Sequence, residues 1–342
     1  MRRRESLASL EEVRALVREL PGADEGAAGK ARAREAELTK PQGALGRLEA
    51  LSQWLAAWQG RHPPRVERPR ACVFAGNHGI AAQGVSAYPA EVTAEMVKNF
   101  SAGGAAVNQL CRVMDADLRV YEMALEEPTR DFTEGAAMDG AACARAMSYG
   151  MMAVEPGIDV LCLGEMGIGN TTSAAAISLA LFGGEAADWV GPGSGVSGAR
   201  LRRKLAAVRD AVKLHAGALS DPLEVMRRLG GQELAAIAGA VVAARLARTP
   251  VLLDGYAATA AAAVLYALDP GLLDHCQAAH RSAEPGHGRL LEAIRKQPIL
   301  DLDMRLGEAT GAVLALGVLK GACACHGGMA TFQDAGVSGK LD

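Results

Sequence analysis

The sequence predicts an α/β fold: an open, mostly parallel, Rossmann-like sheet flanked by helices, with a smaller helical layer from the N- and C-terminal segments. Half of the 342 residues are hydrophobic but only 4% are aromatic, which favours small aliphatic side chains packed between helices and a parallel sheet. Short apolar runs also alternate with long segments able to form helices, the pattern of a doubly wound sheet. Finally, several of these runs end in glycine or a polar residue, as ligand-binding strands do.

The N-terminal part of the chain has helical periodicity. Residues 6–20 and 30–59 carry apolar side chains at roughly helical spacing, and the proline-containing stretch 61–70 predicts a linker. We expect residues 1–70 to form a helical segment that packs with the C-terminal helices. Residues 71–296 then form the α/β domain, and residues 297–342 form a C-terminal segment.

Four apolar runs are predicted to be buried parallel strands: residues 71–75, 118–121, 160–163 and 251–253. Gly76-Asn77-His78-Gly79 follows the first run, Gly164-Glu165 the third and Asp254-Gly255 the fourth. Because ligands of open α/β sheets bind at the carboxyl ends of the strands, these turns should meet in one crevice.

The turn after the third run has the composition of a phosphate cradle. Gly167 and Gly169 let the backbone approach a ligand closely, and Asn170, Thr171 and Thr172 can cap the helix that follows. The free N–H groups of that helix start favour an anion. Glu165 in the same turn suits a hydroxyl-bearing group such as a ribose. The alternative is a turn that only lets a strand and a helix pack closely.

Glu308 is a candidate general base, because it precedes a helix-forming run and has apolar neighbours that would raise its pKa. A favourable charge at a helix start is the alternative. Lys204, in an amphipathic helix, either reaches a phosphate or is a solvated surface lysine. Residues 279–287 predict a loop that closes over a ligand, or an ordinary surface loop. Asp301, Asp303 and Arg305 are expected to form local ion pairs.

Composition argues against several classes of protein. A net charge of -3 leaves no basic excess for nucleic acid. No uncharged run reaches the length of a membrane span, so a cytoplasmic protein is expected. The seven cysteines are an odd number, and they lack the spacing of a zinc site. We therefore expect neither a disulfide framework nor a metal.

Segments spread along the chain together resemble the nicotinate-nucleotide:dimethylbenzimidazole phosphoribosyltransferase family. They are TKPQGALGRL (39–48), GNHGIAAQGVSAYP (76–89), LGEMGIGNTT (163–172), VGPGSGV (190–196), LDGYA (253–257), HRSAEPGH (280–287) and LGEATG (306–311). The family often has Asp in place of Asn77 and Gly in place of Ala309.

The resemblance implies transfer of a phosphoribosyl group from nicotinate mononucleotide to 5,6-dimethylbenzimidazole, a step of cobalamin assembly, without a cofactor. Glu308 would take the N–H proton of the benzimidazole. Further residues would bind the substrates: Glu165, Gly167, Gly169, Asn170, Thr171 and Thr172 the phosphate and ribose, Lys204 the phosphate, Gly193, Gly255 and Ser282 the nucleotide, and Ser86 and Tyr88 the base.

The resemblance also implies a homodimer. Two other interpretations stay open: the same transfer to another aromatic acceptor, or a non-catalytic nucleotide-binding regulatory subunit. A dinucleotide-dependent oxidoreductase is disfavoured, because no G-x-G-x-x-G follows the first predicted strand.

Overall fold

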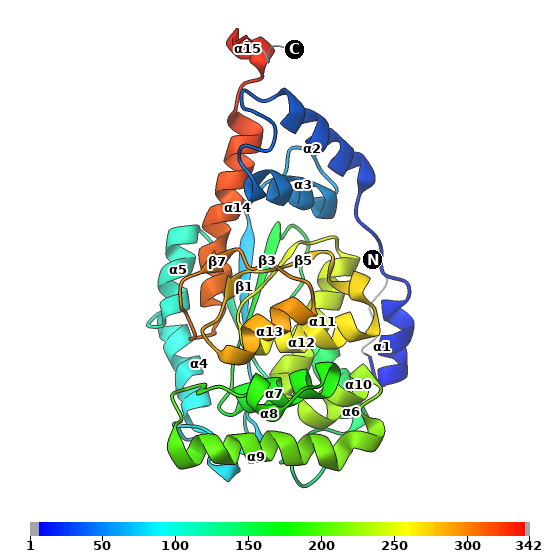
Figure 1. Ribbon diagram of the computed structural model, residues 1–342, viewed down its shortest axis with the longest axis vertical. Helices are drawn as coiled ribbons and strands as arrows, with labels where there is room; N and C mark the ends of the chain where they lie inside the picture. Colours follow the sequence, from blue (N-terminus) through cyan, green and yellow to red (C-terminus); the bar gives the residue numbers. More distant parts are fainter. Residues whose placement is uncertain (1–6, 339–342) are drawn as a thin grey trace.

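The computed structural model describes residues 7–338 and has a five-stranded parallel sheet at its centre (Figure 1). The strands lie in the order β2-β1-β3-β4-β5. They are β1 (Pro69–Ala75), β2 (Asp117–Glu122), β3 (Val160–Met166), β4 (Val251–Leu253) and β5 (Cys276–Ala278). The fold class and the first four strands are thus confirmed. The prediction missed β5, which is only three residues long and has polar Gln277 in its middle.

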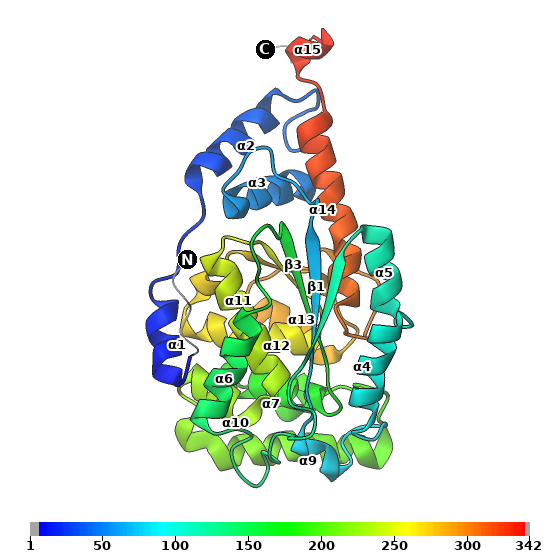
Figure 2. The ribbon, with the colours of Figure 1, turned by 180° about the vertical axis from the view of Figure 1, so that it is seen from behind.

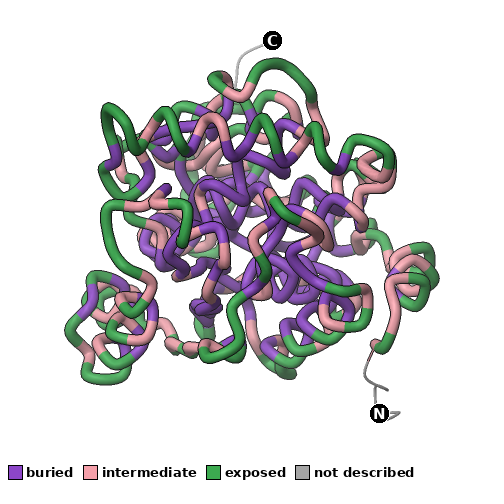
Figure 3. Tube along the Cα trace, turned by 90° about the horizontal axis from the view of Figure 1, so that it is seen from below, coloured by how far each residue is buried: buried purple, intermediate pink, exposed green. Residues whose placement is uncertain are grey.

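The two faces of the sheet pack into two separate cores, because successive strand residues point to opposite faces. In β1, Cys72 and Phe74 belong to the larger core, whereas Ala71 and Val73 belong to the smaller one. Helices cover both faces, so buried residues fill the centre and exposed ones form the rim (Figures 1–3). This double cover explains why the inner strands β1, β3 and β4 are buried and largely apolar, whereas the edge strand β2 is partly exposed and carries charged residues.

The helices divide between these two cores. The larger core receives α1 (Leu10–Val17), α6 (Gly140–Met151), α7 (Asn170–Phe182), α8 (Ala186–Trp189), α9 (Gly198–His215), α10 (Pro222–Leu229), α11 (Gln232–Leu246), α12 (Tyr256–Leu268) and α13 (Pro285–Ala293). The smaller core receives α3 (Arg47–Gln59), α4 (Val92–Ala102), α5 (Ala106–Met114) and α14 (Thr310–Gly328).

The N-terminal helices differ from the prediction. The expected helix at 30–59 is two helices, α2 (Glu25–Glu37) and α3. The chain leaves the helix before Pro41, which lacks an N–H and disfavours the helical conformation of the preceding residue. Gly43 and Gly46 then adopt positive φ angles of 78° and 54°. Helix α1 is also shorter than the predicted 6–20, and Ser6 lies outside the described residues.

A helical layer of α2, α3 and the C-terminal half of α14 stands at one end of the molecule (Figures 1 and 2). The side-chain amide of Gln59 donates a hydrogen bond to the carbonyl of Asp159, just before β3 (3.1 Å). This layer therefore covers the amino ends of the strands. Helix α14 is long and apolar enough to cross a membrane, yet its inner face is buried in the smaller core. The three-segment division at 70 and 296 stays a prediction.

The segment 279–287 is a loop only in part: residues 282–284, which include the pocket residues Ser282 and Glu284, have no regular secondary structure, and the residues on either side of them do. It forms β6 (His280–Arg281), which pairs with β7 (Leu300–Asp301), and the first turn of α13. His280 and His287 are buried. Three short 3-10 turns, η1 (Gly79–Gln83), η2 (Ala216–Ala218) and η3 (Pro270–Leu273), and the terminal α15 (Phe332–Ala335) complete the fold.

Candidate functional site

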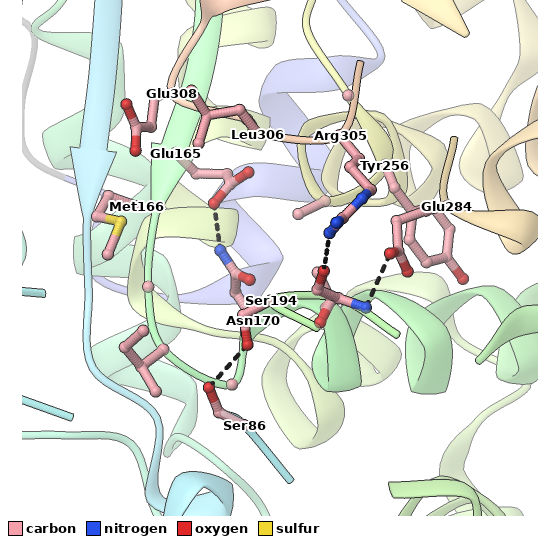
Figure 4. A pocket seen from close by; sticks show the side chains of 18 of the residues that line it. Ser86, Glu165, Met166, Asn170, Ser194, Tyr256, Glu284, Arg305, Leu306 and Glu308 are labelled. Atoms are coloured by element: carbon pink, nitrogen blue, oxygen red, sulfur yellow. Dashed lines mark hydrogen bonds between the residues drawn. The ribbon is translucent and has the colours of Figure 1, made fainter. Parts of the chain in front are cut away.

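A pocket of about 560 Å³ opens at the carboxyl ends of the strands (Figure 4). It lies beside the boundary between β1 and β3, where this strand order changes direction and where ligands of such sheets bind. Eleven of the predicted site residues line it: Ser86, Tyr88, Glu165, Gly167, Gly169, Asn170, Thr171, Gly193, Gly255, Ser282 and Glu308. Lys204 and Thr172 are not among its lining residues.

The glycine turn after β3 leads directly into α7. Gly169 has a φ of +98°, which favours glycine, and a Cβ on Gly167 would come within 2.6 Å of the carbonyl oxygen of Gly76. Asn170 and Thr171, the first two residues of α7, line the pocket, so the positive end of the helix dipole lies at its wall, a suitable environment for an anion. The turn thus has the shape that the sequence predicts.

The polar side chains of this turn do not cap α7, contrary to the prediction. Asn170 instead donates a hydrogen bond to the carboxylate of Glu165, and Thr171 accepts one from Lys204. Glu165 lies on β3 rather than in the turn itself. Burial, and then the nearby carboxylates of Glu233, Asp254 and Glu308, raise the pKa of Glu165 well above its usual value. Thr172 is buried away from the pocket.

Lys204 is a buried residue, so the solvated-lysine alternative is wrong. Its side chain is directed inward from α9, and Nζ donates to Thr171 Oγ1 (2.8 Å) and to the carbonyl of Gly191 (3.0 Å). Burial lowers its pKa to about 8, against the effect of Glu284, which raises it. The ammonium therefore lies directly behind the pocket wall, between Thr171 and Gly193.

Glu308 lies in the pocket wall with 5% of its surface exposed. Within residues 7–338, no hydrogen bond reaches its carboxylate. Burial raises its pKa to about 7, and the charge of Asp254 adds to that effect. Its own N–H donates to the carbonyl of Glu165 (3.2 Å), so the backbone at Glu308 is attached to β3. The carboxylate is thus partly ionised at neutral pH and free to accept a proton.

The wall near Glu308 is largely apolar. Val85, Val92, Met96 and Met166 line it, and Tyr88 lies at the mouth with about half of its surface exposed. Such a wall suits a flat aromatic ring. The hydroxyl of Ser86 lies 3.1 Å from that of Ser194, which links the loop after β1 to the loop before α9 (Figure 4).

Two charged pocket residues were not predicted from the sequence, Arg305 and Glu284. Arg305 Nη1 donates to the carbonyl of Gly193 (3.0 Å), and the N–H of Gly193 donates to Glu284 Oε1 (2.8 Å). The expected local ion pair of Arg305 is absent among the described residues; Asp301 pairs with Arg281 instead (3.4 Å). The only sequence signal was that Glu284 lies inside a segment that resembles the family and Arg305 directly precedes another.

Ser282 lines the pocket, and the buried ring of His287 contacts its backbone. The N–H of Ser282 donates to His287 Nδ1 (2.8 Å), and burial lowers the pKa of His287 to about 3, which keeps this ring neutral. Asn77 donates to the carbonyl of Leu125 (2.9 Å) and does not line the pocket. In the described part of the chain, no group of three or more His, Cys, Asp or Glu side chains is arranged to hold a metal ion.

Comparisons with known proteins agree with this geometry. A family model described as "Phosphoribosyltransferase" matches residues 20–337. The nicotinate-nucleotide–dimethylbenzimidazole phosphoribosyltransferases of Brucella anthropi and Sinorhizobium medicae are each 59% identical to this chain, over 96% and 97% of it and 97% and 98% of their own lengths. The crystal structure of the Thermus thermophilus enzyme is 42% identical with a TM-score of 0.84, covering 93% of this chain and all of that one.

Proposed function

This chain belongs to the nicotinate-nucleotide–dimethylbenzimidazole phosphoribosyltransferase family, and we propose that it transfers the 5-phosphoribosyl group of nicotinate mononucleotide to 5,6-dimethylbenzimidazole. The products are α-ribazole 5′-phosphate and nicotinate, and the reaction serves cobalamin nucleotide-loop assembly. The observation that carries the proposal is Glu308: a carboxylate with a pKa of about 7 in an aromatic-sized pocket beside an anion-binding helix start.

Glu308 acts as the general base in this proposal. One benzimidazole nitrogen attacks C1′ of the ribose, while the carboxylate takes the proton from the other nitrogen. The bond between C1′ and the pyridinium nitrogen breaks, and its electron pair neutralises the ring of the departing nicotinate. The leaving group therefore needs no acid, and the enzyme mainly orients the two reactants. Attack opposite the leaving group converts the β configuration into α.

The donor phosphate is assigned to the N-terminus of α7. Thr171 and the N–H groups of that turn contact the phosphate, and Lys204 contributes positive charge from behind Thr171. Asn170 occupies one oxygen of Glu165, which leaves the other to bind a ribose hydroxyl. Gly193, Gly255 and Ser282 complete the nucleotide side, and Ser86 and Tyr88 border the acceptor.

A product assay tests the proposal. Purified protein is mixed with nicotinate mononucleotide and 5,6-dimethylbenzimidazole, and α-ribazole 5′-phosphate is followed by chromatography. We expect Glu308→Ala to lower kcat by about 10²- to 10⁴-fold, the usual contribution of a general base, with donor binding retained. Lys204→Met should instead weaken donor binding by roughly 10- to 100-fold, the loss of one charged interaction.

The alternatives predict different results in the same assay. A regulatory nucleotide-binding protein binds the donor but makes no product with any aromatic acceptor. If another aromatic acceptor is the true substrate, it should give product faster than dimethylbenzimidazole, by about 10- to 200-fold, since an apolar wall separates related rings by only about 1–3 kcal/mol.

The assembly proposed for this chain is a homodimer in the cytoplasm, as the family resemblance implies. Tyr88 and Leu306, two large apolar side chains at the pocket mouth, are each more than half exposed. Light scattering on the purified protein measures the mass; a monomer at micromolar concentration contradicts the dimer.

A further inference from the structure

We propose that Asp254 is a positioning residue of this enzyme: its buried carboxylate holds the first turn of α14 and thereby keeps Glu308 at the pocket wall. The inference rests on the proposed function, in which Glu308 is the base. Asp254 lies in the family-like segment 253–257 but does not line the pocket, and the resemblance gives it no role.

Asp254 caps the N-terminus of α14, although it lies far from that helix in the sequence, directly after β4. The residue follows β4, has no exposed surface, and accepts the N–H of Ala312 at 2.9 Å. Burial raises the pKa of Asp254, whereas His280 and the N–H groups of Ala312, Gly311 and Ala309 act against that effect by stabilising the carboxylate charge. Ala309, the cap residue of α14 itself, has no side chain that can accept these bonds. Asp254 therefore satisfies N–H groups that a helix start otherwise leaves unpaired.

The backbone that Asp254 holds is strained. Glu308 and Ala309 have φ angles of +61° and +62°, a conformation that costs a residue with a side chain about 1–2 kcal/mol. Strain of this kind persists only where the surroundings enforce it. Here two contacts hold the turn: the N–H of Glu308 donates to the carbonyl of Glu165 on β3, and the N–H of Ala312 donates to Asp254. Loss of the Asp254 contact lets the turn relax away from the pocket.

The charge of Asp254 also acts on Glu308 directly. It raises the pKa of Glu308 and that of Glu165 on β3. The other titratable groups that face this cluster are Glu233 on α11, Cys162 on β3 and His280 on β6, whose Nε2 lies 3.6 Å from Asp254 Oδ1. Within residues 7–338, Oδ2 of Asp254 has no hydrogen-bond partner.

Two substitutions separate positioning from charge. Asp254→Ala removes both, and we expect kcat to fall about 100-fold, the usual cost of a misplacement near 1 Å, with an unchanged KM for nicotinate mononucleotide. Asp254→Asn keeps an oxygen for the N–H of Ala312 and should restore most of the kcat lost in the alanine variant. Because it removes a negative charge near Glu308, the acid limb of its kcat profile should move to lower pH.

The matched control is Asp159→Asn. Asp159 is also buried and accepts two backbone N–H groups, from Glu67 (3.0 Å) and Arg68 (2.9 Å), but at the opposite end of the sheet. We expect this variant to lose stability without any movement of the acid limb.

The rate of amide hydrogen exchange in the segment 308–313 measures how firmly Asp254 holds this turn, and it does not depend on enzyme activity. Exchange should become faster in Asp254→Ala than in Asp254→Asn.

A folded alanine variant with the kcat and the exchange rates of the unaltered protein overturns the proposal. If the alanine variant does not fold, an asparagine variant with an unmoved acid limb overturns it. If the unaltered protein makes no product, the proposed function fails, and hydrogen exchange alone decides whether Asp254 holds the turn.

Discussion

Two buried glutamates at opposite ends of the sheet show how hydrogen-bond partners determine the pKa of a carboxyl group, and with it its role. Glu308 at the pocket is 5% exposed, and Glu35 in the helical layer is 7% exposed. Burial raises the pKa of Glu308 to about 7. Burial acts on Glu35 in the same direction, but hydrogen bonds from His326, Lys40 and Ser52 outweigh it and lower its pKa.

The partners of Glu35 come from α3, α14 and the loop that follows α2. His326 on α14 lies 2.6 Å from Glu35 Oε1, Ser52 on α3 donates to the same oxygen (3.1 Å), and Lys40 lies 3.1 Å from Oε2. Glu35 thus stays charged and joins α2, α3 and α14 together. At similarly small exposure, a carboxylate stays charged where donors surround it and accepts a proton where they do not.

The largest expected effect on stability comes from removing Glu35 and with it the hydrogen bonds that join α2, α3 and α14. Glu35→Ala should lower the free energy of unfolding by about 3 kcal/mol at pH 7, the lower end for a broken buried ion pair, because His326 loses this partner while Lys40 keeps Glu49. Urea-induced unfolding measures it. The difference should shrink in acid: a lowered pKa stabilises the fold above the unfolded value near 4.5, and that contribution disappears as pH falls through the folded pKa. Glu37→Ala, on the exposed side of α2, is the control; a loss below about 1 kcal/mol for Glu35→Ala contradicts the comparison.

Replacing Glu308, whose carboxylate has no hydrogen-bond partner within residues 7–338, should change the free energy of unfolding in the opposite direction. Glu308→Gln is expected to raise the free energy of unfolding by up to about 3 kcal/mol at pH 8 and to leave it unchanged at pH 4. The sign follows from the raised pKa, because the folded state loses stability as pH rises from the unfolded value of 4.5 to about 7. Thermal unfolding at both pH values tests this. An equal effect at pH 4 would show that packing, not ionisation, is responsible.

An uncharged substitution beside the Glu308 turn should show the effect of moving this residue without changing the charges around it. A Cβ at Gly164 would lie 2.0 Å from the backbone nitrogen of Ala309, so Gly164→Ala should push the Glu308 turn away from β3. We expect a loss of about 1–3 kcal/mol in stability, as for other overpacked sites, together with a lower kcat. Parallel unfolding and activity measurements check this; a folded variant with unaltered kcat contradicts the close approach.

The smallest effect is expected far from the pocket, on the same helix. A Cβ at Gly321 in α14 meets no atom within 4 Å. Gly321→Ala should therefore stabilise the protein by about 0.5–1 kcal/mol, because glycine loses more chain entropy than alanine in a helix. The acid limb of kcat should stay where it is. A loss of stability would show that the exposed face of α14 is covered, for instance by a second protomer.

Local signals in the chain were sufficient for much of this protein. Apolar runs determined four of the five strands, the glycines determined the turn before α7, and Glu308 was recognisable as a carboxylate among apolar neighbours. These features depend on residues that lie next to one another. The resemblance to the family supplied the residue roles, which stay predictions.

Only the tertiary structure decided how distant segments meet. Ala312 donates to Asp254 across 58 residues, and Arg305 donates to Gly193 across 112. No periodicity reports such pairs, because each depends on the strand order and not on local composition. The same holds for the pKa of Glu308: the chain supplies the carboxylate, but the packing of two strands and one helix start removes its water and places Asp254 beside it.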